Sequence, residues 1–256
     1  MTTGAMELSI LLPAFVAGLL VTATHVPLGT QVLARGIVFI DLAIAQIAGC
    51  GVLVADQFGF EAEGMAVQIA ALAAALGGAL LLTWTERVWP DVQEALIGVV
   101  FVLAATGGAL LLASNVHGSE HLRDLLVGQI LWVQPARLGW AAVVYAGILA
   151  LWFGWRRHLG RVGFYALFAC AVTISVQLVG VYLVFATLIV PPLATRAMAP
   201  GRRMIAAWML GAIGYAVGLG VSTALDLPSG PAIVWALAVL ALIWYAIAPR
   251  ALAVPE

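Results

Sequence analysis

Long apolar runs, separated by short segments that hold most of the charges, dominate this 256-residue sequence. A helix of about 20 apolar residues crosses the roughly 30 Å of hydrocarbon in a bilayer, and most of these runs approach that length. The chain is 64% apolar and 9% charged, whereas soluble domains are about 45–50% apolar and about 25% charged. We therefore expect an all-α polytopic membrane protein of about eight or nine transmembrane helices, forming a single transmembrane domain over residues 1–256.

The apolar runs and the Pro, Gly or charged residues between them predict nine crossings. The expected helices are 8–24, 37–55, 64–83, 93–113, 138–155, 162–178, 181–195, 204–222 and 231–248. Segment 162–195 is expected to form a tight hairpin at Gly180. Segment 119–133 is too short for a comfortable crossing, so we expect an interfacial or re-entrant helix there.

The positions of the cations predict the orientation in the membrane. All eleven cationic residues are arginines, with three between positions 156 and 161 and three between 196 and 203. Arginine-rich short loops lie in the cytoplasm, so these loops and the carboxyl terminus are expected inside a bacterial inner membrane, with the amino terminus outside. Segment 114–137 departs from the pattern, because Arg123 and Arg137 then fall outside.

Asp41 is the most informative polar residue, because it lies inside an apolar run. A carboxylate at helix-centre depth costs about 2.5–3.5 kcal/mol on insertion scales, so it should face a protein-lined or wet cavity. We interpret Asp41 as a residue of a translocation path, with Gln46 deeper in the same helix. The alternative is that Asp41 reaches the interface or pairs with Arg35.

His117, Glu120 and His121 form a second candidate site. Two imidazoles and a carboxylate at this spacing can share one helical face and suit zinc or manganese. The string also matches the HxxEH pattern of inverted zinc peptidases, but only membrane spans surround it. A weakly metal-binding outer loop and a helix start capped by hydrogen-bonded histidines both remain open.

Other polar residues have simpler interpretations. Gln177 belongs to a polar patch in 162–178 that either lines a path or forms hydrogen bonds between helices. Glu94 opens a helix, where a carboxylate meets the positive end of the helix dipole. His25 and His158 are isolated at expected helix ends, which favours structural or interfacial roles.

The sequence offers no site for nucleotides. It has no glycine-rich loop ending in Lys-Ser or Lys-Thr, and no lysine at all. The few arginines lie in short loops, which does not support nucleic-acid binding. We therefore expect a transport protein rather than an enzyme, without a permanently bound cofactor, whose energy comes from a partner subunit or an ion gradient.

Four stretches, taken in order, resemble the permease subunits of ABC importers for zinc, manganese and iron. They are LGTQVLARGIVFIDLAIAQIAGCGV, QEALIG, HGSEHLRDLLVGQILWV, and VQLVGVYLVFATLIVPPLATR with DLPSGPAIV downstream. The resemblance covers most of residues 25–240. It implies a permease homodimer, or a pair of related permeases, that docks on cytoplasmic ATPases and receives a divalent metal ion from an extracytoplasmic metal-binding protein.

The sequence departs from that family in two places. Members with a known metal gate often carry Asp-x-x-x-His on the second helix, whereas here Asp41 and Gln46 are five residues apart, about 140° around a helix. Only Asp41 is carried over as a possible ligand. The loop 156–161 is also shorter than the segment that docks on the ATPase in the family.

These departures keep two alternatives open. The chain could be a non-transporting or regulatory membrane component that retains the permease fold. It could also be a permease of the same fold for a metal chelate or another small solute.

Overall fold

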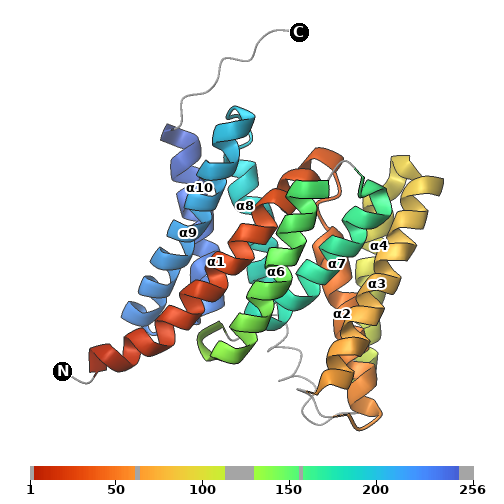
Figure 1. The fold of residues 1–256 in the computed structure, drawn as a ribbon, viewed down its shortest axis with the longest axis horizontal. Coiled ribbons are helices and arrows are strands. Elements are labelled where there is room, and N and C mark those ends of the chain that lie inside the picture. The colour runs from red at the N-terminus through yellow and green to blue at the C-terminus, as the bar shows by residue number, and fades with distance from the viewer. Residues whose placement is uncertain (1–2, 61–63, 113–129, 156–157, 248–256) are drawn as a thin grey trace.

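The structure, a computed structural model, describes residues 3–60, 64–112, 130–155 and 158–247. These residues form nine α-helices and two short 3-10 helices, and they contain no β-strand (Figure 1). The α-helices are α1 (Thr3–Arg35), α2 (Ile40–Gln57), α3 (Met65–Val88), α4 (Gln93–Leu112), α6 (Pro135–Trp155), α7 (Gly160–Val179), α8 (Val181–Ala194), α9 (Pro200–Leu225) and α10 (Ser229–Ile247). The 3-10 helices are η1 (Pro90–Val92) and η2 (Ile130–Trp132).

Every predicted crossing corresponds to one of these helices. Eight stretches of the described chain are long and apolar enough to span a membrane, and the apolar helix α8 is shorter, with 14 residues. The protein is thus an all-α, multi-pass membrane protein, as the sequence predicts. Of segment 119–133, only the last few residues are described, and Ile130–Trp132 form the 3-10 helix η2; the rest lies outside the described residues.

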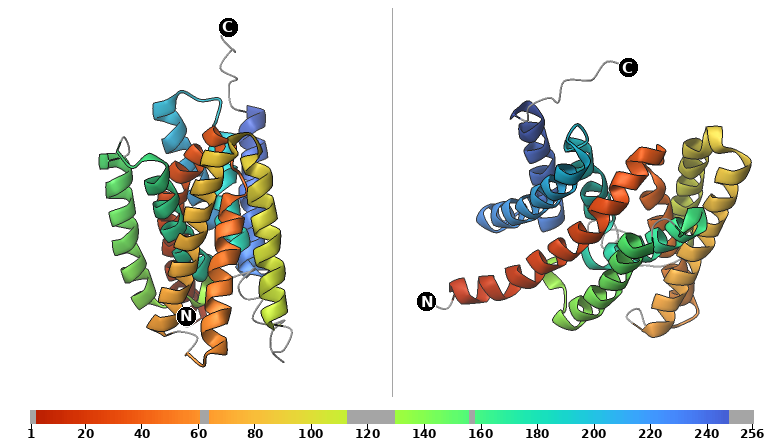
Figure 2. Two further views of the ribbon diagram at one scale, coloured as in Figure 1. Left: turned by 90° about the vertical axis from the view of Figure 1, so that its right-hand side faces the viewer. Right: turned by 45° about the horizontal axis from the view of Figure 1, so that its top comes forward.

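The helices pack in three groups (Figures 1 and 2). Helix α2 packs against α3 and α4 on one side of the molecule, and α9 packs against α10 on the other. Helices α1, α6, α7 and α8 lie between these groups, where α1 contacts α8 and α9, and α7 contacts α3 and α2. The beginning of α1 and the end of α10 lie at opposite ends of the bundle.

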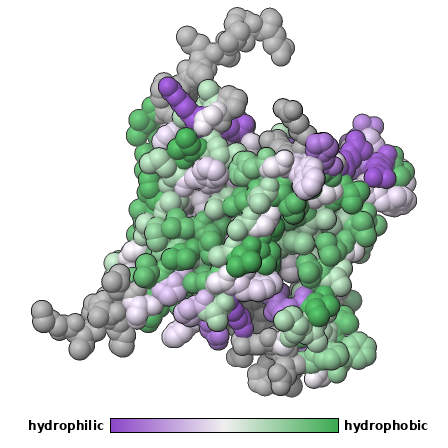
Figure 3. All heavy atoms as spheres, viewed as in Figure 1, coloured by the Kyte–Doolittle hydropathy of each residue, from purple (hydrophilic) through white to green (hydrophobic). Residues whose placement is uncertain are grey.

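The surface reverses the pattern of a soluble protein. Apolar residues cover the middle of the face in Figure 3, and the polar residues gather toward its two ends. Large apolar side chains such as Leu103, Leu110 and Trp235 are more than half exposed on the outer helices. Such a belt is suited to contact with lipid rather than water, because an apolar side chain that faces lipid gains no hydrophobic free energy by moving into the protein interior.

Helix α1 differs from its predicted end. The sequence places the end at position 24, before Pro27, whereas the helix continues through Pro27 to Arg35. A proline inside a helix removes one backbone N–H donor, but buried helices tolerate this where side chains and neighbouring helices satisfy the backbone. The carbonyl that Pro27 leaves without its helical donor is that of Ala23. On either side of it in the sequence, the Thr24 hydroxyl donates to the Val21 carbonyl and the Thr30 hydroxyl to the Val26 carbonyl, each at 3.0 Å.

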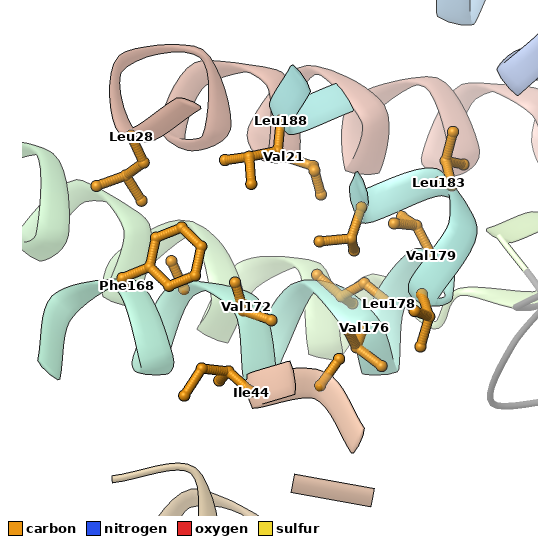
Figure 4. Close-up of a cluster of buried hydrophobic side chains, with 14 of the residues drawn as sticks. Val21, Leu28, Ile44, Phe168, Val172, Val176, Leu178, Val179, Leu183 and Leu188 are labelled. Carbon is orange, nitrogen blue, oxygen red and sulfur yellow. The ribbon is translucent and has the colours of Figure 1, made fainter. Parts of the chain in front are cut away.

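The predicted hairpin at Gly180 is confirmed. Gly180 separates α7 from α8 and has a φ of 85°, a conformation that glycine adopts without steric cost. The turn folds α8 back so that Val179 and Leu183 join a buried cluster with Val21 of α1 and Val172 of α7 (Figure 4). This core, where α1, α7 and α8 meet, positions the polar residues described next.

Candidate polar path between helices α1, α2 and α7

Four buried side chains of α1, α2 and α7 hold polar atoms that have no hydrogen-bond partner in the structure. They are Thr22 and His25 of α1, Asp41 of α2 and Thr173 of α7. Helix α7 contacts both α1 and α2, so these residues come from three neighbouring helices. Most buried polar groups in proteins are paired, and unpaired groups mark strain, a bound ion or water, or a functional site.

Asp41 is the second residue of α2 and is 1% exposed. Neither of its carboxylate oxygens has a side-chain partner; the donors near them are the backbone N–H groups of Asp41 and Leu42 at the start of α2. Three residues later on the same face, Ile44 lies beside α7 (Figure 4), so the Asp41 face of α2 is directed into the protein rather than into lipid. The predicted location of Asp41 in the protein interior therefore agrees with the structure.

The alternative pairing of Asp41 with Arg35 is not seen. Asp41 is buried, and no ion pair joins it to Arg35 within the described residues. The guanidinium carbon of Arg35 instead lies 4.3 Å from the centre of the Phe164 ring, a cation–π contact. The Asp41 carboxylate thus lacks a cationic partner at this end of α1.

Glu94 lies at the start of its own helix, as predicted, but its hydrogen bond goes to the start of a second helix, α2. It stands in the first turn of α4, and its Oε1 accepts a hydrogen bond at 3.2 Å from the backbone N–H of Phe39, the residue before α2 begins. The other oxygen, Oε2, is buried without a partner. Because Phe39 directly precedes α2 and Asp41 is the second residue of that helix, the start of α2 carries two carboxyl groups.

His25 is the functional candidate that sequence reasoning missed. The prediction of a helix end at position 24 placed it at the membrane surface, whereas it lies within α1, ten residues before Arg35, and is fully buried. Its Nδ1 lies 3.0 Å from the Val21 carbonyl oxygen and 3.0 Å from the Thr24 hydroxyl, while Nε2 has no partner. The sequence did contain a signal that α1 is longer, because its apolar pattern continues past Pro27.

The two glutamines assigned to the path are both half-buried. Gln46 lies five residues beyond Asp41 in a continuous helix, so the two side chains point about 140° apart. Gln177 lies in the last turn of α7, whereas Asp41 lies in the first turn of α2, and the two helices run in the same direction (Figure 1). The structure therefore does not bring either glutamine together with Asp41.

The remaining predicted ligands, His117, Glu120 and His121, lie outside the described residues. Within the part of the chain that the structure describes, no three His, Cys, Asp or Glu residues group as a metal site would require. Side chains that are too far apart to coordinate an ion together do not form a site that retains a metal ion.

Other buried hydroxyls in the same region are paired. The hydroxyls of Tyr145 and Ser175 lie 2.5 Å apart and link α6 to α7, and those of Thr187 and Tyr215 lie 2.9 Å apart and link α8 to α9. The unpaired atoms of His25 and Asp41 therefore differ from these paired hydroxyls.

A multi-pass helical bundle with unpaired polar groups along its interior helices is the architecture of a membrane transport protein. The sequence matches the ABC 3 transport family over residues 7–164 and 150–248, and the chain belongs to this family. It is therefore a permease, the membrane subunit of an ABC importer, and a transport subunit rather than an enzyme.

Two solved structures share the fold. The structure of PsaBC from Streptococcus pneumoniae in complex with Fab has a TM-score of 0.77 and 21% sequence identity, covering 94% of this chain and 92% of that chain. An inward-facing structure assigned to the metal-chelate type of ABC transporter has a TM-score of 0.67 and 18% identity, covering 92% and 85%. No curated protein sequence gives a significant match.

Proposed function

We propose that this permease moves a divalent metal ion, zinc, manganese or iron, across the bacterial inner membrane into the cytoplasm. A separate ATPase subunit supplies the energy, an extracytoplasmic metal-binding protein delivers the ion, and two permeases form the membrane dimer. Asp41 carries the proposal, because it is a buried carboxylate without a cationic or side-chain partner. A cation that passes this point gives the carboxylate the partner it lacks.

The proposed path has an outer and an inner part. His117, Glu120 and His121 would receive the ion outside, and Asp41, with Glu94 nearby, would hold it at the inner end of α2 before release. This order follows from the arginine-rich loops, which favour the Arg35 end of the bundle as the cytoplasmic side. Gln46 and Gln177 would offer weaker oxygen ligands along the way.

A bare ion is favoured over a metal chelate by the chemistry of the interior. A chelated metal already has its coordination positions filled, so it would gain little from unpaired carboxylate and imidazole groups. A bare or partly hydrated ion needs such ligands to replace its water.

The test is metal uptake by cells that express the permease with the ATPase and metal-binding protein encoded beside it. We expect uptake of at least one of radioactive zinc, manganese and iron, and a loss of at least about tenfold in Asp41→Asn, which removes the charge but keeps the shape. The matched control is Asp91→Asn at the same end of the bundle, where Asp91 is exposed, and its uptake should equal that of the wild type.

Two outcomes would contradict the proposal. Uptake that requires an added chelator would identify a chelate permease. Wild-type uptake by Asp41→Asn, at an equal amount of inserted protein, would reduce Asp41 to a structural residue.

A further inference from the structure

We infer that His25 supplies a nitrogen ligand to the transported metal ion at mid-depth in the membrane, contributed by α1. The inference rests on the proposed function, since it assigns a residue to the path of the same ion. It adds a third point of contact, separate from the carboxyl groups at the start of α2 and from the predicted outer histidines.

The hydrogen bonds of His25 determine which ring nitrogen is available. Nδ1 lies 3.0 Å from the backbone carbonyl oxygen of Val21, which can only accept, so Nδ1 carries a proton. Burial without a charged partner disfavours the doubly protonated ring. In the neutral ring Nε2 is then unprotonated, and its lone pair is free to bind a metal.

This arrangement matches the way in which proteins prepare a histidine ligand. A metal-binding histidine usually donates its other ring N–H to a carbonyl or carboxylate, which fixes the tautomer and the ring orientation. For His25 the Val21 carbonyl takes this part, and the Thr24 hydroxyl lies 3.0 Å from the same nitrogen. Only the ligand position at Nε2 is unoccupied.

The position of His25 on α1 directs it into the protein. It lies four residues after Val21 and three before Leu28, so the three side chains share one face of the helix. Val21 and Leu28 both belong to the buried cluster that α1 forms with α7 and α8 (Figure 4). Ten residues separate His25 from Arg35 at the end of α1, a distance of about 15 Å along the helix.

Unpaired hydroxyl groups lie near His25 in the sequence and on a neighbouring helix. Thr173 of α7 is buried, and its Oγ1 lacks a partner. Thr22, three residues earlier on α1, is also buried and unpaired, but its side chain lies against Gly211 of α9. Hydroxyls and an imidazole without a carboxylate bind weakly, which suits an ion in transit. Imidazole favours zinc over manganese, which prefers oxygen ligands.

The experiment compares His25→Asn with the wild type. The asparagine amide can keep the donation to the Val21 carbonyl but cannot reach the position of Nε2. We expect zinc uptake at limiting zinc to fall at least about tenfold, and manganese uptake to fall less, so the ratio of zinc to manganese transport drops. The ratio is the discriminating readout, because a general loss of stability lowers zinc and manganese uptake together.

The control is Thr106→Ala in α4, since Thr106 is exposed and its hydroxyl donates to carbonyls of its own helix, and its uptake should match the wild type. A structural role for His25 predicts a different pattern: zinc and manganese uptake per inserted molecule are reduced equally or not at all. That pattern overturns the inference. If His25→Asn fails to insert, His25→Gln, which places an amide near the Nε2 position, is compared for the same transport ratio.

Failure of the inference is distinguishable from failure of the proposed function. A wild-type permease that transports no divalent metal refutes the proposed function. A wild type that transports zinc, together with a His25→Asn variant of unchanged zinc-to-manganese ratio, leaves the function standing and refutes the role of His25.

Discussion

At the scale of single residues, the interior contains two kinds of polar group. The first kind is paired across helices, as the Tyr145 hydroxyl is with Ser175. The second kind, His25 and Asp41, is equally buried and has unpaired atoms. Both kinds cost free energy to remove from water, but only the first recovers that cost within the chain, so the two kinds should respond differently to mutation.

The paired hydroxyls should differ in their contribution to stability. In Tyr145→Phe, the Ser175 hydroxyl loses its Tyr145 partner inside the bundle, and we expect the free energy of unfolding to fall by about 1 kcal/mol. In Tyr215→Phe, Thr187 keeps its 2.7 Å bond to the Leu183 carbonyl, so the loss should be below about 0.5 kcal/mol. Unfolding of the purified variants in mixed detergent measures both, and equal losses would contradict this account.

The sequence indicated that Asp41 is buried but gave no such indication for His25, for a physical reason. A carboxylate inside an apolar run is costly wherever the helix ends lie, so the residue type alone marks it. A histidine is informative only when its depth is known. The depth of His25 depends on whether α1 stops at Pro27, which is decided by contacts with other helices.

At the scale of the helices, the contact between α1 and α8 depends on Gly29. A Cβ at this position would collide with the backbone carbonyl oxygen of Leu188, and a backbone atom cannot move aside as a flexible side chain can. The glycine thus lets the two helices approach closely.

Gly29→Ala should therefore separate α1 from α8. We expect the free energy of unfolding to fall by about 1–3 kcal/mol, as in overpacked cores, and uptake to fall with it. The control is Gly98→Ala in α4, where an added Cβ meets no atom within 4 Å. Its stability should be unchanged or raised by up to about 1 kcal/mol, since alanine favours helix over glycine. Equal melting temperatures for the two variants would refute the close-contact explanation.

Most helices could be predicted from the sequence, because length and hydropathy alone define a membrane span. Eight of the nine predicted spans differ from the observed helices only by a few residues at their ends. The boundary at Gly180 was also predictable, because glycine is favoured where the chain needs a positive φ. The approach of Gly29 to Leu188 was not, because it joins residues far apart in the sequence.

At the scale of the whole molecule, the arginine-rich loops predict that the Arg161 end of the bundle faces the cytoplasm. Arg161 is exposed near the start of α7, 3.8 Å from Glu86 (Nε to Oε1), and Phe58 is exposed at the opposite end, after α2. The two positions thus report on opposite sides of the membrane.

The orientation can be tested by labelling intact cells with an impermeant thiol reagent. In a variant whose Cys50 and Cys170 are replaced by alanine, Phe58→Cys should be labelled from outside, and Arg161→Cys only after the cells are permeabilised. Labelling of Arg161→Cys in intact cells would reverse the orientation and, with it, the proposed order of the path.

The length of α1 has a consequence for the surrounding bilayer. Its apolar stretch, Ser9–Arg35, contains 27 residues, which is about 40 Å of helix, while the hydrocarbon is about 30 Å thick. To keep that stretch within the hydrocarbon, α1 must tilt by about 40°, and in Figure 1 it slants across its neighbours. A thicker bilayer would let α1 stand more upright, so the lipid composition of the membrane bears directly on the helix that holds His25.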